Sequence, residues 1–570
     1  MRFLLLTMLI CAASAQPNPA SVKAQVDALF TAWDNKNSPG CALSVLQNGA
    51  VLYQRGYGMA DLEHAVSITP NSVFQIASMS KQFTAMAILL LVQEGKLSLD
   101  DPVSRYIPEL PDYGAPVTLG HMLHHTSGLR NLFPLFLLAG WRWGDLGTER
   151  NELDMVARQH ALNFTPGEEY HYTNTGYFLL AEVVKRVAKQ SFREFTTARI
   201  FEPLGMRHTV AFDDTGMILP NRAMAYNAAP GRGFLNNVTL DETVGASNIY
   251  TTVEDLVQWD ANFYDAKVGG KTAIATMEQP GKLNNGQLLE YGAGLEISNH
   301  KGLRMIWHSG RTSYRGDYLR FPDHHFSVIC LCNSGDINAS DIARKVADIY
   351  LAEFEQQAPA STIPAGPDAV AGVEKAARAA AVTASPAELE RLAGSYLLRD
   401  ALVVRRALVD NGRLLLDRGR GVVSELVPVG PDRFVMLGVP ERVEVVFAAN
   451  RTGQTMAILP PGQRPIRADR VNPAITPDLH EYDGTFWSTD VGEPVTVAAR
   501  ESKLWLQTKR NVEFELRPLA ADIFTNQWFG RLTFHRNATN DVLDLTMSNP
   551  EVRNFVMAKV TVRMDHLPYR

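Results

Sequence analysis

The chain has 570 residues, of which 46% are apolar and 20% are charged, and its formal net charge at pH 7 is −6. This is the composition of a folded protein, which excludes disorder of the whole chain and collagen-like repeats. Surfaces that read nucleic acid normally carry an excess of Lys and Arg, so no nucleic-acid partner is expected. Four cysteines are too few for a disulfide scaffold.

The first 15 residues predict a signal peptide. Arg2 precedes the apolar run Phe3–Ile10, and Ala13-Ser14-Ala15 has the form of a cleavage site. No later stretch holds 18 consecutive apolar residues, so we expect no membrane span after the signal is removed. The sequence therefore predicts an exported protein, periplasmic or secreted.

Residues 22–356 mix helical and strand-like patterns. A hairpin is predicted across Asn48-Gly49, because apolar runs flank this turn dipeptide. Ser78–Glu94 predicts a long buried helix that stops at Gly95, and Gly176–Lys189 predicts an amphipathic helix. Thr252 begins a further helix with a capping pattern.

The end of this region returns to strands. Strand signals lie at 304–307, 317–321 and 326–332, and a helix is predicted at 336–354. Strands at both ends of a helical middle indicate one antiparallel sheet flanked by helices, with a helical insert. The predicted fold class is therefore α/β, in the α+β sense.

A repeat follows an Ala- and Pro-rich linker with a possible short helix, predicted at 357–385. Gly394-Ser395-Tyr396 returns 90 residues later as Gly484-Thr485-Phe486, and Leu414, Leu416, Leu426, Pro428, Asp432 and Phe434 keep the same offset. Each copy alternates apolar and polar residues in short runs. We predict two small antiparallel β-barrel domains, 386–472 and 476–566, that fold separately from the first domain.

The tetrapeptide Ser78-Met-Ser-Lys81 carries the first chemical signal. At the start of a helix, its hydroxyl and amine lie on one face, where the amine can take the hydroxyl proton. The pattern alone is weak, because Ser298-Asn-His-Lys301 also matches it. The second copy falls in a predicted turn between strands, so we expect it to be structural.

Two further motifs strengthen the first copy. The phenol of Tyr172, in Tyr172-Thr-Asn174, could relay a proton, and Asn174 could orient the amine or a substrate carbonyl; a buried tyrosine with a satisfied hydroxyl is the structural alternative. His308-Ser-Gly310 ends a predicted strand, and Gly310 would let a substrate approach the backbone. His300-Lys-Gly302 also fits H-x-G, which makes that pattern uninformative by itself.

Taken together with Gly95–Asp101 and His125-Thr-Ser-Gly-Leu129, these motifs resemble the serine β-lactamase and penicillin-recognising peptidase family. The likeness is to its class C-like branch of D,D-peptidases, D-aminopeptidases and related esterases, over residues 25–352. It implies a nucleophile at Ser78 and proton transfer by Lys81 and Tyr172. It also implies an oxyanion hole made by the backbone N–H groups of Ser78 and Arg311.

One departure from the family pattern is informative. β-Lactamases of this branch usually carry Lys-Thr-Gly where this chain has His308-Ser-Gly310. A histidine with an ordinary pKa of about 6.5 is mostly neutral at pH 7, whereas lysine is a cation. His-x-Gly occurs in the family's peptidases and some esterases, so a dedicated β-lactamase is less favoured. The C-terminal repeats resemble the lipocalin-like barrels appended to some D-aminopeptidase relatives.

Other candidate sites are expected to be structural. His121, His124 and His125 have helical spacing but no H-E-x-x-H pattern, so we do not expect a metal site. Leu132–Ala139 is more typical of core than of a pocket lining. The three mature cysteines, Cys41, Cys330 and Cys332, are expected to be small buried residues, and their odd number leaves at least one thiol free.

The predicted function is that of an exported serine hydrolase that forms an acyl-enzyme on Ser78 without a metal or organic cofactor. Its expected substrates are peptides or amides with a D-residue, including peptidoglycan-derived ones, or small esters. β-Lactam hydrolysis is one alternative. The other is a non-catalytic protein that binds cell-wall fragments, against which the intact Ser78, Lys81 and Tyr172 argue. The oligomeric state is left open.

Overall fold

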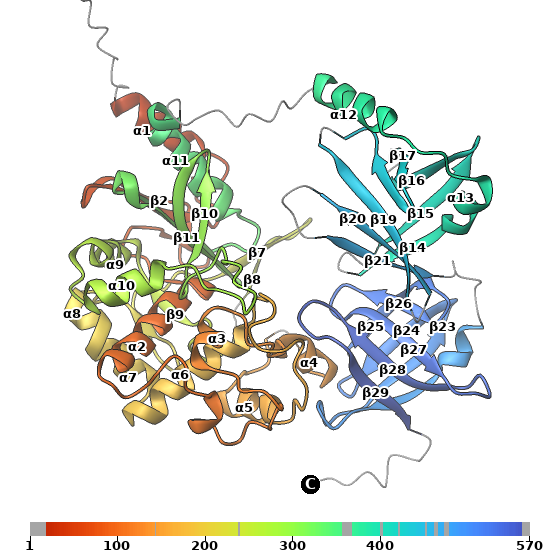
Figure 1. Cartoon of the computed structure of the whole chain (residues 1–570). Helices are drawn as coiled ribbons and strands as arrows, with labels where there is room; N and C mark the ends of the chain where they lie inside the picture. The colour runs from red at the N-terminus through yellow and green to blue at the C-terminus, as the bar shows by residue number, and fades with distance from the viewer. Residues whose placement is uncertain are drawn as a thin grey trace, which may run out of the picture.

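The computed structural model describes residues 19–142, 144–237, 240–355, 367–399, 403–419, 422–439, 441–450, 453–460, 465–471 and 478–560. The predicted signal peptide lies outside these residues. A domain of helices and strands is followed by two closed β-barrels (Figure 1). None of the helices in the described ranges is long and apolar enough to cross a membrane.

One antiparallel sheet organises the first domain, as predicted. Its strand order joins both ends of the domain, because β1 pairs with β13. The hairpin β1–β2 turns at Asn48-Gly49, where both residues have positive φ (52° and 76°). In sheet order, the strands are β10 (Glu296–His300), β11 (Leu303–Arg311), β12 (Arg315–Phe321), β13 (Phe326–Cys332), β1 (Cys41–Gln47) and β2 (Ala50–Tyr57).

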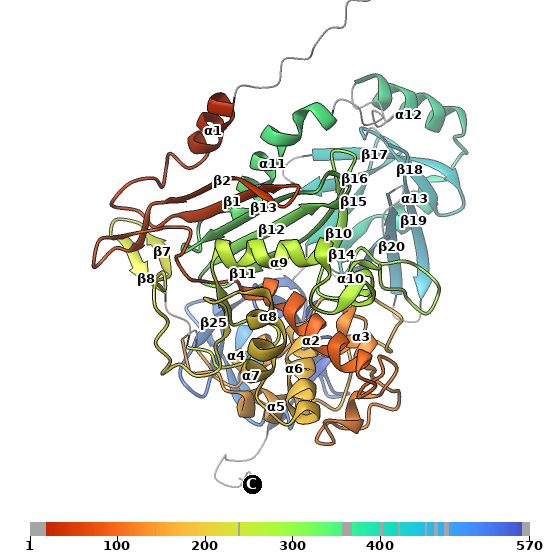
Figure 2. The same cartoon turned by 90° about the vertical axis from the view of Figure 1, so that its left-hand side faces the viewer.

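Helices cover both faces of this sheet (Figure 2). On one face, α1 (Pro19–Ala28) and α11 (Ala339–Glu355) bury apolar side chains that include Val26 and Val346. The other face carries the main core, in which α2 (Lys81–Gln93) and α9 (Val253–Asp265) pack with Trp259 fully buried. The apolar stripes of these helices therefore supply the hydrophobic stabilisation of the domain.

The structure confirms three predicted helices: α2 for 78–94, α6 for 176–189 and α9 for the helix after Thr252. The hydroxyl of Thr252 accepts the N–H of Asp255 and so caps α9. The helical region also contains α3 (Leu119–Leu123), α4 (Leu132–Leu138), α5 (Glu149–Ala157), α6 (Asn174–Ala188), α7 (Phe192–Thr196), α8 (Glu202–Leu204) and α10 (Gly270–Glu278). Short pairings involve β3 (Met59–Asp61), β4 (Val66–Ser67), β5 (Phe74–Gln75), β6 (Val210–Ala211), β7 (Tyr226–Ala229), β8 (Gly233–Asn236) and β9 (Ile249–Thr251).

The cysteines differ from the expectation in one respect. All three are buried, but Cys41 and Cys332 form a disulfide, and only Cys330 is a free thiol. The two bonded residues are direct partners across β1 and β13, with their Cα atoms 4.0 Å apart. The bond closes a separation of 291 residues and locks the centre of the sheet.

Two helices precede and flank the first barrel. The predicted linker contains α12 (Pro367–Ala379), longer than the short helix expected, and Ala377 packs against Val427, Val435 and Leu437 of that barrel. α13 (Pro386–Leu392) follows, capped by Ser385. The linker helix is thus part of the first barrel's packing.

The two predicted barrels are confirmed as closed eight-stranded structures. The first consists of β14 (Gly394–Leu398), β15 (Val404–Asp410), β16 (Arg413–Gly419), β17 (Val422–Gly430), β18 (Arg433–Met436), β19 (Val443–Asn450), β20 (Gly453–Leu459) and β21 (Ile466–Val471). The second consists of β22 (Gly484–Trp487), β23 (Val495–Arg500), β24 (Lys503–Thr508), β25 (Glu513–Ala520), β26 (Ile523–Asn526), β27 (Gly530–Arg536), β28 (Val542–Ser548) and β29 (Phe555–Val560).

The 90-residue repeat appears in the strand register itself. Leu414 faces Leu426 in the first barrel, and Leu504 faces Leu516 in the second. Both interiors are filled by apolar side chains, such as Tyr396 and Phe447 in the first and Phe534 in the second. The repeat therefore reflects two copies of one packing scheme.

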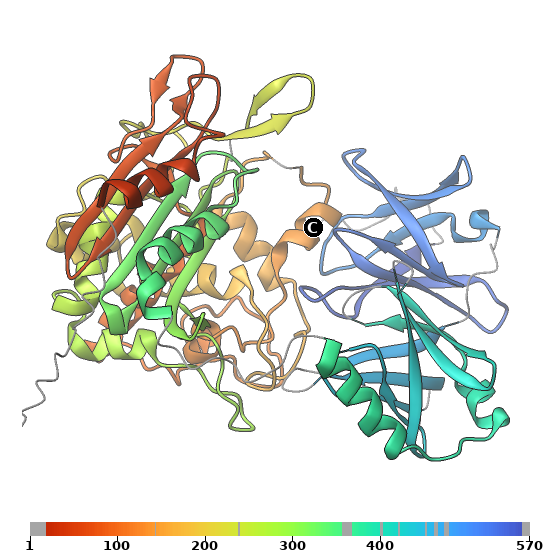
Figure 3. The same cartoon turned by 90° about the horizontal axis from the view of Figure 1, so that it is seen from above.

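Of the two barrels, as far as their described residues go, only the second contributes buried side chains to the main core of the first domain (Figures 1 and 3). The ring of Trp528 packs edge-on against Phe133 of α4, with centroids 5.9 Å apart. At the interface, the guanidinium of Arg130 donates to Asp490 (3.0 Å) and to the carbonyl of Arg553 (3.3 Å). The apolar segment at 132–139 is thus core, as expected, at a boundary between domains.

Candidate active site

Ser78 lies in a 3-10 turn, η1 (Ala77–Ser80), that leads directly into α2. The preceding Ala77 has a φ of 47°, an unusual conformation for alanine that marks local backbone strain. β11 packs against this turn: a Cβ at Gly310 would lie 2.2 Å from the carbonyl oxygen of Ile76. The predicted reason for this glycine was therefore incomplete, because the close approach is to the chain's own Ser78 turn.

The side chain of Lys81 is buried at the start of α2, and its Nζ reaches three oxygens. It lies 2.8 Å from Oδ1 of Asn174, 2.8 Å from the carbonyl oxygen of Ala246 and 3.2 Å from Oγ of Ser78. Burial holds the pKa of Lys81 well below its usual range, which favours the neutral amine.

The three contacts assign the atoms of the amine in its neutral form. A neutral amine has two N–H groups and one lone pair, and the oxygens of Asn174 and Ala246 can only accept hydrogen bonds. Both N–H groups are thereby used, and the lone pair remains for the O–H of Ser78. The geometry suits Lys81 as the base that takes the proton of Ser78.

The backbone that holds Lys81 was not found from the sequence. Besides the carbonyl of Ala246, the same segment accepts a hydrogen bond from Thr84 at Gly245 (2.7 Å) and donates one from Ile249 to Ser80 (3.1 Å). These are main-chain groups far along the chain from Lys81. No side-chain motif could have indicated them.

Tyr172 and Asn174 lie on either side of the residue that caps α6. The hydroxyl of Thr173 accepts the N–H of Thr175, which fixes the start of the helix at Asn174. The Nζ of Lys81 lies 4.8 Å from the centroid of the Tyr172 ring. Burial raises the pKa of Tyr172, and a hydrogen bond with Ser78 opposes the rise. The structure thus brings Ser78, Lys81, Tyr172 and Asn174 together.

His308 is neutral in its surroundings. Its Nδ1 donates to the carbonyl of Ser309 (2.7 Å), so its Nε2 is the acceptor that faces the hydroxyl of Tyr291 (3.2 Å). Burial lowers the pKa of His308 to about 3, and the neighbouring Lys81 adds to the lowering in its protonated form. His308 therefore contributes no positive charge at pH 7. Tyr291 was not identified from the sequence, since it belongs to no motif.

Arg311 ends β11 with an exposed side chain, next to Gly310 and the Ser78 turn. The backbone N–H groups of Ser78 and Arg311 belong to these two adjoining segments.

The sites expected to be structural have structural contacts. Ser298 lies on β10, rather than in the turn that follows it, and accepts the indole N–H of Trp307 (3.0 Å). His121 completes a capping box with Thr118, and His124 contacts the carbonyl of Gly120. Within the described residues, the one group of three side chains spaced for a metal is the cysteine cluster, two of whose members are disulfide-bonded.

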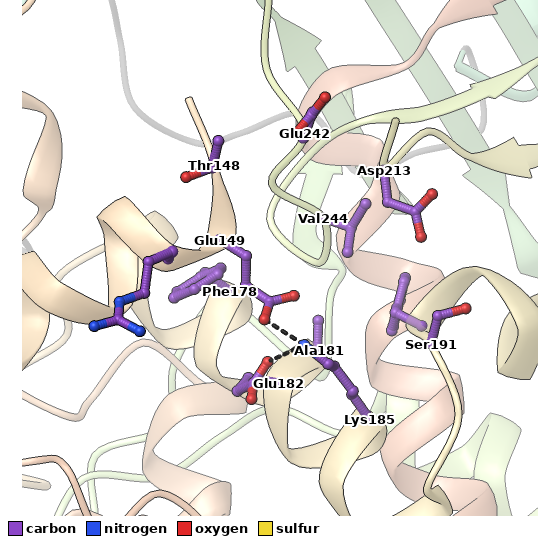
Figure 4. A pocket seen from close by; sticks show the side chains of 12 residues that line it. Thr148, Glu149, Phe178, Ala181, Glu182, Lys185, Ser191, Asp213, Glu242 and Val244 are labelled. Carbon is purple, nitrogen blue, oxygen red and sulfur yellow. Dashed lines mark hydrogen bonds and ion pairs between the residues drawn. The ribbon is translucent and has the colours of Figure 1, made fainter. Parts of the chain in front are cut away.

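A separate cavity of about 390 Å³ lies beside α6, further along the helix from Asn174 (Figure 4). Figure 4 shows Glu149 and Glu182 both directed at Lys185, with Asp213 and Glu242 at other walls. Ser78, Lys81 and Tyr172 do not line it. Lys185 pairs with two of the carboxylates in the cavity wall, Glu149 and Glu182.

Comparison with known proteins matches this chain to a family and to individual relatives. A beta-lactamase family model matches residues 26–353. The chain is 29% identical over 432 residues to penicillin-binding protein 4* of Bacillus subtilis, covering 73% of this chain and 92% of that protein. It is 28% identical over 301 residues to a D-aminopeptidase of Gluconobacter oxydans, covering 52% of this chain but only 56% of that enzyme.

Solved structures show the same fold. The octameric penicillin-binding protein homologue from Pyrococcus abyssi is 24% identical, with a TM-score of 0.52 over 79% of this chain and 99% of that one. The D-amino acid amidase from Ochrobactrum anthropi, complexed with L-phenylalanine amide, is 21% identical, with a TM-score of 0.50 over 59% of this chain and 99% of that one.

Proposed function

The chain belongs to the beta-lactamase family, and from this premise we propose that it is an exported serine hydrolase that forms an acyl-enzyme on Ser78. The observation that carries the proposal is the environment of Lys81. Its amine is buried and lies 2.8 Å from two acceptor-only oxygens, so in its neutral form the lone pair is left to face the Ser78 hydroxyl at 3.2 Å. This arrangement activates a serine at neutral pH.

The proposed reaction has two stages. Oγ of Ser78 attacks the substrate carbonyl carbon while its proton passes to Lys81, and the N–H groups of Ser78 and Arg311 stabilise the oxyanion. The bond from the carbonyl carbon to the leaving group then breaks, and the proton reaches the leaving amine or alkoxide through Lys81 and Tyr172. Water next attacks the acyl carbon, and Ser78 leaves with a proton, which restores the enzyme.

The proposed substrates are peptides or amides with a D-residue, including peptidoglycan-derived ones, followed by small esters. D-Aminopeptidases among the relatives support the first class. The neutral His308, in the position of a lysine in related β-lactamases, disfavours strong attraction of a substrate carboxylate. Efficient β-lactam hydrolysis is accordingly the weaker candidate.

A matched substrate panel tests the proposal. D-alanyl and L-alanyl p-nitroanilides, p-nitrophenyl butyrate and a chromogenic cephalosporin should be compared with the native chain and with Ser78→Ala. We expect turnover of the D-anilide above that of the L-enantiomer, slow turnover of the cephalosporin, and none with Ser78→Ala. Fast cephalosporin turnover would favour a β-lactamase instead, and no turnover of any substrate would favour a binding protein.

Export into the periplasm or the medium is part of the proposal. The Cys41–Cys332 disulfide supports it, because such bonds persist mainly in oxidising compartments. Mass spectrometry of the protein from fractionated cells should find a mature chain that begins at Gln16. Intact protein retained in the cytoplasm with its first 15 residues would contradict this part of the proposal.

A further inference from the structure

His125, which the sequence grouped with a structural turn, contacts the backbone on both sides of Tyr172. Its carbonyl oxygen accepts the N–H of His171 at 2.8 Å, and its ring Nδ1 accepts the N–H of Thr173 at 3.2 Å. The ring also packs on the Tyr172 ring, with centroids 4.2 Å apart. One residue thus holds the main chain before and after Tyr172 as well as the Tyr172 ring.

Further hydrogen bonds join the same two parts of the chain. The stretch 126–130 runs beside 163–175: Thr126 accepts the N–H of Gly167 (2.8 Å), and the carbonyl of Arg130 accepts the hydroxyl of Thr175 (2.8 Å). His125 belongs to the same set of contacts and lies against the ring of Tyr172. Its φ of 56° is left-handed, a conformation that costs a non-glycine residue energy.

The hydrogen bonds also define the state of the imidazole. Nδ1 accepts a hydrogen bond, so the ring proton is on Nε2, and Nε2 is buried without a partner among the described residues. Burial and the nearby Lys81, His308, His124 and His171 hold the pKa of His125 well below its usual range. The neutral ring therefore keeps Nδ1 available as an acceptor.

A purely packing residue would not need this nitrogen. The ring lies among aromatic side chains, with centroid distances of 5.1 Å to Tyr177 and 4.7 Å to Tyr291, and a phenylalanine would fill that space without leaving a buried N–H unpaired. What phenylalanine could not do is accept the N–H of Thr173. The hydrogen bond that Nδ1 accepts from Thr173 therefore explains why this position holds a histidine.

We propose that His125 is a positioning residue that fixes Tyr172 against Ser78 and Lys81 through its carbonyl oxygen and its Nδ1. The inference rests on the proposed function, in which Tyr172 transfers a proton. Misplacing a proton-transfer group by about 1 Å can cost about 100-fold in rate, so the effect belongs in kcat.

Two amide substitutions separate the acceptor from the bulk of the side chain. His125→Asn retains an oxygen close to the place of Nδ1 and tolerates a positive φ. His125→Gln is also a neutral amide, but its polar atoms lie one bond further out, near the place of Nε2. We expect His125→Gln to lower kcat for p-nitrophenyl butyrate by about 10- to 100-fold, with KM within about twofold, and His125→Asn to keep most of the activity.

A double-mutant cycle with Tyr172→Phe then tests the route of the effect, with rates measured well below the unfolding temperature of each variant. If His125 acts through Tyr172, Tyr172→Phe and the double variant with His125→Gln should be equally slow. The positioning role would be overturned if the losses of the two single variants multiplied in the double variant. It would also be overturned if His125→Gln were as active as the native enzyme while Tyr172→Phe was impaired. A fully active Tyr172→Phe would instead refute the role of Tyr172 in the proposed function, and the positioning role with it.

Should His125→Gln not fold, the His125→Asn variant still decides the matter. Its kcat and its pH profile should match those of the native enzyme, because the acceptor is retained while most of the ring is lost. A folded His125→Asn with kcat reduced to the level of Tyr172→Phe would show that ring packing, and not the acceptor, matters.

Discussion

Replacing Arg130 by methionine should loosen the second barrel from the hydrolase domain without touching Ser78. The Arg130 side chain is 4% exposed, and its ion-pair partner Asp490, from the barrel, is 16% exposed. The guanidinium also donates to Gln159 (3.2 Å) and to the carbonyl of Arg553 (3.3 Å). The substitution leaves the largely buried Asp490 carboxylate without its cation.

The magnitude follows from this burial. Removing one partner of a buried ion pair costs about 3–5 kcal/mol, whereas a partly exposed pair contributes up to about 1 kcal/mol. The matched control is Arg553→Met, which breaks a two-bond pair with Glu169 (3.0 Å each) at the same interface, where the side chains are 31% and 41% exposed. Replacing both charges, as in Arg130→Met with Asp490→Leu, should restore most of the loss.

Native-state hydrogen exchange measures the opening directly. The amide of Asn131 donates to the carbonyl of Glu551, and the amide of Arg553 donates to the side chain of Asn163, so both are protected only while the barrel is docked. We expect Arg130→Met to speed their exchange by about 100- to 5,000-fold, and Arg553→Met by less than about tenfold. Equal effects of the two variants, or an added loss in the double variant, would refute the reasoning.

Four further results are expected. Ser78→Ala should reduce ester turnover below about 1% of native, with the unfolding temperature nearly unchanged; residual turnover above that level would place the nucleophile elsewhere. Penicillin should add one drug mass to Ser78 and leave slowly, as followed by intact-protein mass spectrometry, whereas rapid release would contradict the role given to the neutral His308. Asn174→Asp puts a carboxylate beside Nζ of Lys81 and should raise the pKa of that amine, so that kcat/KM at pH 7 falls and recovers at higher pH; an unshifted profile would mean that Lys81 is not the base. Burial raises the pKa of Asp317 to about 6 in the folded protein, so the stability that this group contributes is fully present below the unfolded pKa of 3.8 and is lost as pH rises through 6. The change in the free energy of unfolding caused by Asp317→Asn should therefore be more favourable at pH 8 than at pH 4. Urea titrations that give the same change at both pH values would contradict this expectation.

Much of the fold was predictable because its signals are local. The Asn48-Gly49 turn, the apolar period of α6 and the cap at Thr252 each depend on a few neighbouring residues, and the structure confirms all three. The two barrels were predictable for a different reason. Residues that face each other in the first barrel return 90 residues later as facing residues of the second, as Leu414 with Leu426 and Leu504 with Leu516 show.

What could not be predicted depends on distant parts of the chain meeting. The Cys41–Cys332 bond required knowing that β1 and β13 are neighbours, and the carbonyl that holds Lys81 belongs to Ala246, which no motif marks. The role of Gly310 was assigned to substrate because the carbonyl of Ile76 was not yet placed. Separate folding of the barrels remains a prediction, although the second barrel shares buried residues with the first domain's core.

The pairing of β1 with β13 also constrains the order in which the hydrolase domain can form. β1 lies between β2 and β13 in the sheet, so its second edge stays open until residues 326–332 are available, almost 300 residues later. Closing so long a loop is slow, and during that time the hairpin β1–β2 presents an unpaired apolar edge. During synthesis, which starts at the N-terminus, the sheet therefore cannot be completed until nearly the whole domain has been made. Until then, the hairpin must stay unfolded or be shielded by another protein.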